Sequence, residues 1–372
     1  MEACLITDAQ KWNDFIATSP FGAITQTYEW GILARRAESI PLYCGVLDDQ
    51  DNLCAAMLIL VMRLPKINNS YFYVPRGPII TDPDSAALSF LLHFVDSLAR
   101  KYNAFMLKID PVADQHDAVW LQAFAHHGFM ATDSFIHGRG EWVLDIYPDE
   151  KQQLAHMKEK WRYNVRLAQR KGVKIRQGHT PEDIQIFHTI LQETSERDQF
   201  FIHAVDHFEY LMKLFEEGEK AELFLAEYEG QAIAGIIVMR SGQWCWYRYG
   251  ASSSQGRNVM PNHLLQWTSL QWGREHGCTH YNFMGIPAVL TEAEGPKDPN
   301  WGVYNFKRGF GGQARCAMRS QEKPYNPTVY RLYTLVRELK HRYATARYER
   351  SELARKRQEY QTKKGEESLP AR

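Results

Sequence analysis

The alternation of apolar and polar residues in the first half of the chain predicts three strands, a helix and a further strand. From Leu42 the chain reads LYCGVL, then the polar stretch DDQDN, then LCAAMLILVM, which is typical of two strands joined by a turn. A third strand is predicted in YFYVPRGPI and a last one in AFMLKIDP. Between them a helix is predicted from about Ser85 to Lys101, because apolar residues recur on one helical face: Leu88, Leu91, Leu92, Val95 and Leu98.

The same order of elements recurs in the second half of the chain. ELFLAEYEGQAIAGIIVMR predicts a hairpin that turns at Glu229 and Gly230, and WCWYRYGA predicts the next strand. A helix is predicted from Pro261 to His276, and a final strand in THYNFMGIP. The copies are offset by about 175–180 residues, which is the size of a domain and far longer than the period of a solenoid. The pattern therefore indicates a duplicated domain.

Hairpin, strand, helix and strand form the core of the acyltransferase fold of the GNAT acetyltransferases, in which a splayed mixed sheet opens a cleft for the acyl donor. We therefore predict an α+β protein with two tandem GNAT-like domains, each with a mixed sheet. The first domain is predicted to cover residues 1–148 and to be completed by 314–345. The second is predicted to cover 149–313, including a helix at 150–171.

A long C-terminal helix is predicted from about Pro327 to Tyr360. Its first half carries a stripe of apolar residues at helical spacing, which predicts that this stripe docks on the first domain: Val329, Leu332, Val336, Leu339 and Tyr343. Residues 346–372 are mostly charged or polar, and this tail is predicted to be helical or disordered.

The composition excludes several classes of protein. Lys and Arg together number 44, as do Asp and Glu, so any site for a polyanion must be a local patch. The six cysteines are scattered without a C-x-x-C pair or a zinc-like spacing, so no metal is expected. The N-terminus does not resemble a signal peptide, and no apolar stretch approaches the roughly 20 residues of a spanning helix. We expect a cytoplasmic protein that meets membranes only peripherally.

A glycine-rich loop before the main helix is needed by an enzyme of this fold that uses acetyl-CoA, because backbone N–H groups there bind the pyrophosphate. The corresponding positions hold PRGPIITDPD in the first copy and SSSQGRNVMPN in the second, and neither fits the pattern Q/R-x-x-G-x-G/A. The fold thus predicts acyl transfer, whereas the missing loop argues against CoA as the donor.

Several short motifs together resemble the Fem family of peptidoglycan bridge-forming aminoacyltransferases. In order they are Gln26 with Trp30, YFYVPRGP (71–78), LKIDP (107–111), KEKWRYNVRLAQRKGV (158–173), YGAS with MPNHLLQW (249–267), YNFMGI (281–286) and VYNFKRGFGG (303–312). The resemblance covers about residues 20–320, and no coiled-coil insertion interrupts the second domain. It implies aminoacyl-tRNA as co-substrate, no other cofactor, and transfer of an amino acid to the stem peptide of lipid II or of UDP-MurNAc-pentapeptide.

The partners implied are aminoacyl-tRNA and the peptidoglycan precursor, which would bring the chain to the inner face of the plasma membrane if the precursor is lipid-linked. A monomer or a weak oligomer is expected. Two departures from the family leave the choice of acceptor open. Ala34 stands where relatives carry a lysine and is followed by Arg35 and Arg36, while His203 and His207 replace an arginine and a tyrosine that hold the nucleotide end of the precursor in relatives.

The implied reaction is attack by an amine on the ester carbonyl of aminoacyl-tRNA, which develops a negative oxygen and calls for a nearby cation. Lys307 is the candidate, since it lies in the glycine- and aromatic-rich stretch NFKRGFGG. The resemblance implicates Lys307 and Phe306 in stabilising the transfer and positioning the tRNA end. Asp110 ends the strand MLKIDP and is predicted to orient the amine or accept its proton. The structural alternatives are a surface lysine for Lys307 and a turn residue for Asp110.

Other residues are candidates for substrate binding. Arg76 in PRGP suits a phosphate or carboxylate because its guanidinium binds planar oxygens in pairs, although a surface arginine in a turn fits equally well. Tyr247 and Tyr249 are predicted to share one face of their strand and Arg248 to lie on the other, so one of these faces lines a groove. The remaining candidates are Arg35, His203, His207 and Asn262.

The predicted helix at 150–171 is the clearest electrostatic feature. Eight basic residues and one acid lie between Lys158 and Arg176. One ridge repeats a cation every four residues: Lys158, Arg162, Arg166 and Arg170. The opposite ridge is apolar: Leu154, Met157, Trp161, Val165 and Ala168. Because like charges at this spacing repel one another, we expect an anionic partner such as the tRNA backbone or a precursor diphosphate. A solvated face is the alternative.

Two other functions remain open at the level of sequence. One is a GNAT-type N-acyltransferase that acts on another amine, including an acyl-CoA-dependent one. The other is a non-catalytic RNA-binding protein that uses the basic helix and the C-terminal tail, but it leaves the NFKRGFGG stretch unexplained.

Overall fold

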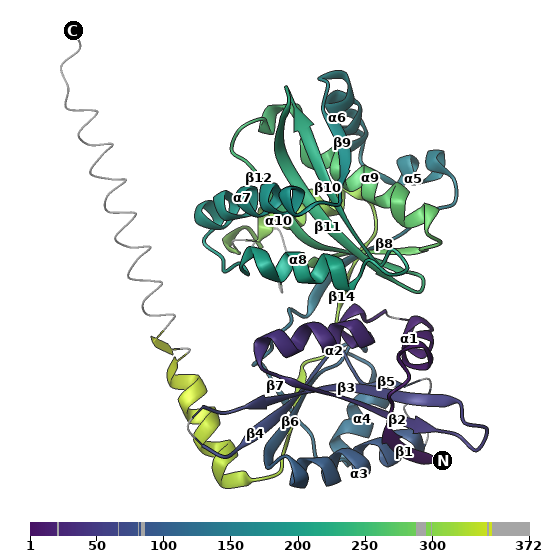
Figure 1. Cartoon of the computed structure of the whole chain (residues 1–372), viewed down its shortest axis with the longest axis vertical. Helices are drawn as coiled ribbons and strands as arrows, with labels where there is room; N and C mark the ends of the chain where they lie inside the picture. Colours follow the sequence, from purple (N-terminus) through teal and green to yellow (C-terminus); the bar gives the residue numbers. More distant parts are fainter. Residues whose placement is uncertain are drawn as a thin grey trace, which may run out of the picture.

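The computed structural model describes residues 1–20, 22–65, 67–80, 82, 86–287, 295–298, 300–340 and 342–343. They form two domains, each built on a mixed sheet covered by helices (Figure 1). The first sheet has the strand order β1-β2-β3-β4-β6-β15-β7 with β5 beside β3, and the second has the order β14-β8-β13-β12-β11-β10-β9. This arrangement confirms the predicted α+β class with two mixed sheets.

The first domain contains the N-terminal elements and a strand from near the C-terminus. Its strands are β1 (Glu2–Leu5), β2 (Ile40–Leu47), β3 (Leu53–Arg63), β4 (Ser70–Pro75), β5 (Ile79–Ile80), β6 (Ala104–Asp110), β7 (Met130–Thr132) and β15 (Ser320–Pro324). Its helices are α1 (Ala9–Ala17), α2 (Tyr28–Ala34), α3 (Ala86–Lys101), α4 (Ala118–His126) and the helix 327–340. The side chains of α3 and α4 fill the core on one face of the sheet, and those of α1 and α2 fill the other.

The second domain repeats this plan. Its strands are β8 (Gly140–Asp145), β9 (Lys174–Gly178), β10 (Ala221–Tyr228), β11 (Gln231–Ser241), β12 (Trp244–Ser252), β13 (His280–Gly285) and β14 (Gln313–Cys316). Its helices are α5 (Glu150–His156), α6 (Glu159–Arg170), α7 (Pro181–Asp198), α8 (Val205–Leu214), α9 (Pro261–Glu275) and α10 (Trp301–Lys307). The helix α9 packs on one face of the sheet, and α7 and α8 pack on the other.

The duplicated unit predicted from the pattern is present in both sheets. In the first domain it is β2, β3, β4, α3 and β6, and in the second it is β10, β11, β12, α9 and β13. In each copy the strand before the helix pairs in parallel with the strand after it, whereas the preceding hairpin is antiparallel. The turn between β10 and β11 falls at Glu229 and Gly230, both of which have positive φ, as a tight hairpin requires.

Strand pairing assigns two strands, β8 and β14, to a different domain from the one predicted. β8 lies inside the range 1–148 but pairs with β13 and β14 of the second sheet. β14 lies largely inside the range 314–345, yet it also belongs to the second sheet, so the chain returns to the first sheet only at β15. These strands pair with partners that are distant in sequence, which local patterning does not specify. The predicted tail 346–372 lies outside the described residues.

The predicted helix at 150–171 is two helices. α5 ends at His156, Met157 is extended, and α6 begins at Glu159. The guanidinium of Arg162 donates hydrogen bonds to the carbonyl oxygens of Leu154 and Met157 at the C-terminal end of α5, where backbone carbonyls lack helical partners. Arg162 therefore stabilises the break. Of the four cations of the predicted ridge, Lys158, Arg166 and Arg170 are exposed at α6, whereas the side chain of Arg162 turns back toward α5.

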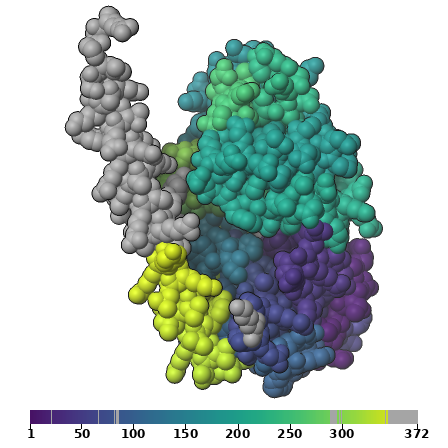
Figure 2. Space-filling model, turned by 60° about the vertical axis from the view of Figure 1, so that its left-hand side comes forward, coloured from purple at the N-terminus to yellow at the C-terminus, as the bar shows by residue number. Residues whose placement is uncertain are grey.

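The helix 327–340 docks on the first domain, as predicted, but through a different face. Tyr333 packs against Tyr71 and Phe105, and Tyr330 and Arg337 bond to the buried Glu322. The predicted apolar stripe points away from the domain, with Leu332 exposed by 63% and Leu339 by 55%. The helix forms an edge of the first domain (yellow in Figure 2). The buried carboxylate of Glu322 on the sheet therefore determines which face of the helix contacts the domain.

The domains are joined by apolar and ionic contacts. Ile24 and Leu33 of the first domain belong to the core of the second. Lys220 pairs with Glu29 at 2.5 Å, and Arg36 pairs with Asp206. Within the described residues, no helix is long and apolar enough to cross a membrane.

Candidate active site

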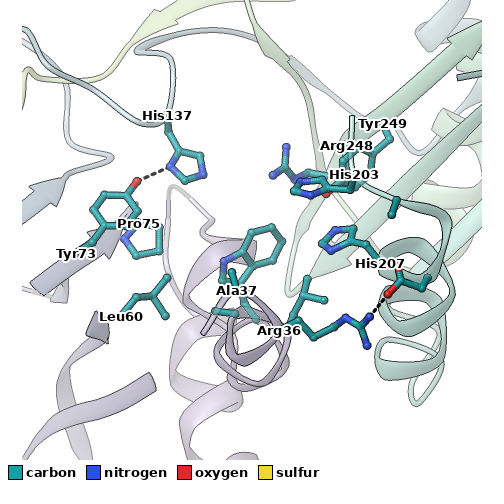
Figure 3. A pocket seen from close by; sticks show the side chains of 15 residues that line it. Arg36, Ala37, Leu60, Tyr73, Pro75, His137, His203, His207, Arg248 and Tyr249 are labelled. Atoms are coloured by element: carbon teal, nitrogen blue, oxygen red, sulfur yellow. Dashed lines mark hydrogen bonds and ion pairs between the residues drawn. The ribbon is translucent and has the colours of Figure 1, made fainter. Parts of the chain in front are cut away.

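The two domains enclose a cavity of about 400 Å³, the interdomain cavity (Figure 3). The first domain lines it with α2, the ends of β3 and β4, and the segment 133–139, and the second lines it with the segment 199–204, α8 and β12. Its polar and aromatic lining residues are Trp30, Arg36, Tyr73, His137, His203, Asp206, His207, Arg248 and Tyr249. The cavity therefore depends on both domains.

The two histidines predicted to bind substrate line this cavity together. The rings of His203 and His207 stack with their centres 4.0 Å apart. Burial, helped by the charges of His203, Arg248 and Arg36, lowers the pKa of His207 to about 4. His207 is therefore neutral at pH 7, and its buried Nε2 has no hydrogen-bond partner within the described chain. This atom is available to a ligand.

Arg248 supplies the positive charge on the same side of the cavity. Its guanidinium lies 5.3 Å from the ring centre of Trp30 and 4.9 Å from that of Tyr249. Its Nε is buried and unpaired among the described residues. A guanidinium held between aromatic rings is suited to bind a planar or phosphate oxyanion. The sequence predicts Arg248 on the strand face opposite Tyr249, but the two side chains lie together in this cavity.

A bulge in β12 explains this error. Tyr249 pairs with Ile237 and Tyr247 with the next residue, Val238, so Arg248 is an extra residue on β12. The extra residue reverses the alternation of side chains. Tyr247 consequently packs with the core under α9, while Tyr249 packs with the core under α7 and α8. The prediction that the two tyrosines share a face is wrong.

Asp110 lies behind the wall of the interdomain cavity. It accepts hydrogen bonds from the hydroxyls of Tyr73, at 2.8 Å, and Ser320, and from the backbone N–H of Ile136 and His137. Burial acts to raise the pKa of Asp110, but the bonds from His137, Ser320 and Tyr73 hold it at about 2. Tyr73 and His137 are themselves joined at 2.6 Å and line the cavity. Asp110 is thus an ionised residue that positions the two side chains in front of it.

Arg76 is engaged inside the protein. Its guanidinium pairs with Glu141 of β8 at 2.6 Å, and both side chains are nearly buried. It also donates to the carbonyl of Gly138. Glu141 in turn accepts a hydrogen bond from Asn282 at 2.9 Å. Arg76 therefore connects the two sheets, and its charge is already balanced by a carboxylate.

Lys307 lies at the end of α10 beside this ion pair and is 5% exposed. Its Nζ donates a hydrogen bond to the carbonyl of Gly285 at 2.5 Å. Burial lowers the pKa of Lys307 to about 8, while the charge of Glu141 acts in the opposite direction. The alternative of a surface lysine is excluded, since the side chain is buried.

A second cavity, of about 330 Å³, lies in the second domain next to α10. Phe306, Tyr247 and Asn262 line it, and all three had been predicted as site residues. Phe200 and Asp198 complete its edge at the C-terminal end of α7. We call it the second-domain cavity. The segment 199–204 contributes Phe200 to this cavity and His203 and Ala204 to the interdomain cavity.

The remaining predicted cations are placed as follows. Lys158, Arg166 and Arg170 are exposed on α6, and Arg170 lies against the ring of Tyr163. On the buried side of α6, the indole N–H of Trp161 donates to the carbonyl of Phe306 at 2.9 Å. Arg35 is exposed and does not line the interdomain cavity, whereas its neighbour Arg36 does.

Several site residues had no interpretable signal in the sequence. His137 lies in a loop that contains no recognisable motif. Glu141 lies in β8, and the sequence does not predict that this strand pairs with the second sheet. Tyr73 falls within the stretch YFYVPRGP, which pointed to Arg76 instead. The sequence signal for Tyr73 is the alternation of side chains along β4, which puts Tyr73 on the same face of the strand as Tyr71.

The fold has counterparts among solved structures. The crystal structure of FemX superposes with a TM-score of 0.81 at 22% identity, covering 89% of this chain and 99% of FemX. A tandem GNAT protein from the clavulanic acid biosynthesis pathway superposes with a TM-score of 0.52 at 14% identity, covering 88% of this chain and 98% of that chain. The fold is therefore that of a protein with tandem GNAT-like domains.

Sequence comparison identifies the family. The chain is 24% identical over 381 residues to a lipid II:glycine glycyltransferase of Staphylococcus saprophyticus, covering 84% of this chain and 90% of that relative. The sequence model of the FemAB family matches residues 7–120, 117–231 and 227–338. The chain belongs to the FemAB family and is an acyltransferase.

Proposed function

We propose that this protein uses aminoacyl-tRNA to add an amino acid to the stem peptide of a peptidoglycan precursor, and that lipid II is the acceptor. The observation that carries the proposal is the pair of adjoining cavities. The segment 199–204 contributes Phe200 to the second-domain cavity and His203 to the interdomain cavity. A donor bound in one cavity and an acceptor bound in the other would both contact this one short segment and would therefore lie close to each other. The names of relatives as lipid II:glycine glycyltransferases favour lipid II over the UDP-linked precursor.

The interdomain cavity suits the acceptor. Its volume of about 400 Å³ is that of a small-molecule site and can hold the sugar and diphosphate of a precursor. Arg248 supplies positive charge for the diphosphate, and the unpaired Nε2 of His207 supplies a further polar contact, while Arg36 is paired with Asp206. This set differs from the lysine, arginine and tyrosine that the resemblance implies for relatives.

The second-domain cavity suits the donor. Phe306 and Tyr247 offer aromatic rings on which the terminal adenine of tRNA can stack. The exposed cations of α6 lie on the helix whose Trp161 is bonded to the backbone of Phe306. The tRNA backbone can therefore lie on α6 while its aminoacylated end enters the cavity.

The chemistry follows from the charge states of the buried groups. The amine nitrogen of the stem peptide attacks the ester carbon, so a C–N bond forms and the C–O bond to the ribose breaks. The amine proton passes to the ribose oxygen within the substrates, because Asp110, with a pKa of about 2, is too weak a base for it. Lys307, with a pKa of about 8, is mostly protonated at pH 7 and stabilises the negative oxygen of the intermediate.

Transfer by the purified full-length chain tests the proposal. The chain is incubated with labelled aminoacyl-tRNA and either lipid II in detergent or UDP-MurNAc-pentapeptide, and the products are identified by mass spectrometry. We expect one aminoacylated stem peptide, formed faster from lipid II. Acetylation of an amine from acetyl-CoA would favour an N-acyltransferase of another kind. Binding of tRNA without transfer to either acceptor would favour the RNA-binding alternative.

A further inference from the structure

The helix 327–340 and the residues 342–343 expose a broad apolar face. At about 100° per residue, its large apolar positions fall within roughly 100° of the helix circumference. These positions and their exposed fractions are Leu332 63%, Leu335 53%, Val336 41%, Leu339 55% and Tyr343 73%. The opposite face holds Tyr330, Tyr333 and Arg337, which contact the first sheet. An apolar face of this size on a docked helix indicates a partner.

A second exposed apolar group lies on the same side of the first sheet. Phe135 and Ile136, in the loop between β7 and β8, are each exposed by 55%. This loop and the helix are anchored on one buried ion pair, Lys108 with Glu322, whose charged atoms are 2.9 Å apart. Lys108 donates to the carbonyl of Ser134, next to Phe135.

The helix binds the other half of this ion pair. Glu322 accepts hydrogen bonds from Tyr330 at 2.7 Å and from Arg337 at 2.6 Å. One ion pair therefore holds both apolar groups on one side of the domain. We call them together the apolar surface.

The apolar surface adjoins the interdomain cavity. Ile136 is followed directly by His137, which lines that cavity, and the backbone of both residues bonds to Asp110. A substrate that occupies the cavity would therefore lie beside this surface.

Basic residues flank the apolar face of the helix. Arg331 and Arg342 lie on one side of the stripe and Lys340 on the other, and all three are exposed. Glu338 is the one acid in the sequence from 331 to 343. An apolar stripe bordered by cations is typical of a helix that lies in the interface of an anionic membrane.

We infer that the apolar surface rests on the anionic membrane that carries the lipid-linked acceptor. The inference rests on the proposed function, since a lipid II acceptor would hold its diphosphate at the membrane plane, next to the interdomain cavity. Contact with a second copy of the chain through this stripe would bring the flanking cations of two helices together, which repel one another. The membrane instead offers acyl chains for Leu335 and Leu339 and phosphates for Arg331 and Lys340.

Flotation of the full-length chain with lipid vesicles tests the surface without any transfer reaction. The vesicles contain either phosphatidylcholine alone or phosphatidylcholine with phosphatidylglycerol. We expect the wild-type chain to float with the anionic vesicles and the double variant Leu335→Gln with Leu339→Gln to bind about tenfold more weakly. The matched control changes Val119 and Leu121 of α4, which are each exposed by 40%, to Gln and should bind as the wild type does. Thermal unfolding confirms that each variant is folded.

A charge variant gives an independent measurement. Arg331→Gln with Lys340→Gln should weaken binding to the phosphatidylglycerol vesicles and reduce its salt dependence, with little effect on phosphatidylcholine vesicles. Equal binding of the wild-type chain and the leucine variant to anionic vesicles would overturn the inference. A dimer in sedimentation equilibrium that the leucine variant abolishes would also overturn it and assign the face to a second copy.

Failure of this inference and failure of the proposed function are distinguishable. A chain that transfers an amino acid to lipid II in detergent but does not bind vesicles would overturn the membrane surface and leave the function intact. A chain that binds vesicles through the leucines but transfers no amino acid would support the surface and overturn the function.

Discussion

Tyr247 and Tyr249 lie two residues apart on β12, yet they line different cavities, because the strand bulges at Arg248 between them. The bulge turns Tyr247 toward α9 and α10 and Tyr249 toward α8. One strand thus contributes to both candidate substrate sites. Each candidate site can therefore be tested by substituting its own tyrosine.

Substitution of the two tyrosines should separate donor binding from acceptor binding. Tyr247→Leu should raise the KM for aminoacyl-tRNA about tenfold, because a stacking ring is lost from the second-domain cavity. Tyr249→Leu should raise the KM for lipid II by a similar factor, because it supports the guanidinium of Arg248. Steady-state kinetics with one substrate varied at a time would measure both. An increase in the same KM for both variants would contradict the assignment of the cavities.

Removal of the buried cation should slow the transfer step. Lys307→Met should lower the single-turnover rate by about 10²–10³, the range for loss of one group that stabilises an oxyanion, with little change in acceptor affinity. Lys307→Arg should restore the rate only in part, because its planar charge lies at a different point. A Met variant that is folded and transfers at the wild-type rate would exclude the catalytic role.

The pH dependence gives a second measurement of the same residue. Burial lowers the pKa of Lys307 to about 8, so its charge is present below that pH and is lost above it. We expect the contribution of Lys307 to the rate, taken as the ratio of wild type to Met variant, to fall as the pH rises from 7 to 9. A ratio that is constant over this range would mean that Lys307 does not act as a cation.

Asp110 should stabilise the fold in a pH-dependent manner. Its pKa of about 2 in the folded state is below the ordinary value of 3.8, so its stabilisation is complete above pH 3.8 and is lost as the pH falls toward 2. Asp110→Asn should therefore lower the unfolding free energy at pH 7 by about 2 kcal/mol, and the difference should narrow below pH 4. Urea unfolding at several pH values would measure this difference. A constant difference down to pH 3 would show that the carboxylate charge is not its source.

The exposed cations of α6 should bind tRNA through its backbone. Arg166→Glu with Arg170→Glu should weaken tRNA binding, and more strongly at 50 mM than at 300 mM salt, because phosphate contacts release counterions. Arg100→Glu with Lys101→Glu, a double charge reversal on the exposed end of α3 in the first domain, is the matched control. Filter binding at several salt concentrations would measure both. Equal loss in the control variant would indicate a general charge effect.

Much of the fold was predictable because it depends on neighbours in the sequence. The hairpin of β10 and β11 follows from strand alternation and from the Glu229-Gly230 turn, and α3 and α9 follow from apolar residues at helical spacing. The same local signals recur in both halves, which made the duplication visible. Lys307, Phe306 and Asn262 were found through local motifs, and the structure places them near α10. The roles predicted for them stay predictions.

The tertiary structure decided what depends on partners distant in the sequence. The sequence offers Arg76 either as a ligand of a substrate oxyanion or as a surface residue, whereas the pairing of β8 with the second sheet puts Glu141 2.6 Å from its guanidinium. The helix 327–340 turned its apolar stripe outward because the buried Glu322 binds Tyr330 and Arg337 on the other face. A local pattern records which residues are apolar or charged, but the free energy of burying a charge depends on the partner that the fold supplies. For this reason the sequence determined the elements and the duplication, while the assembly of the two sheets determined the cavities and the faces that line them.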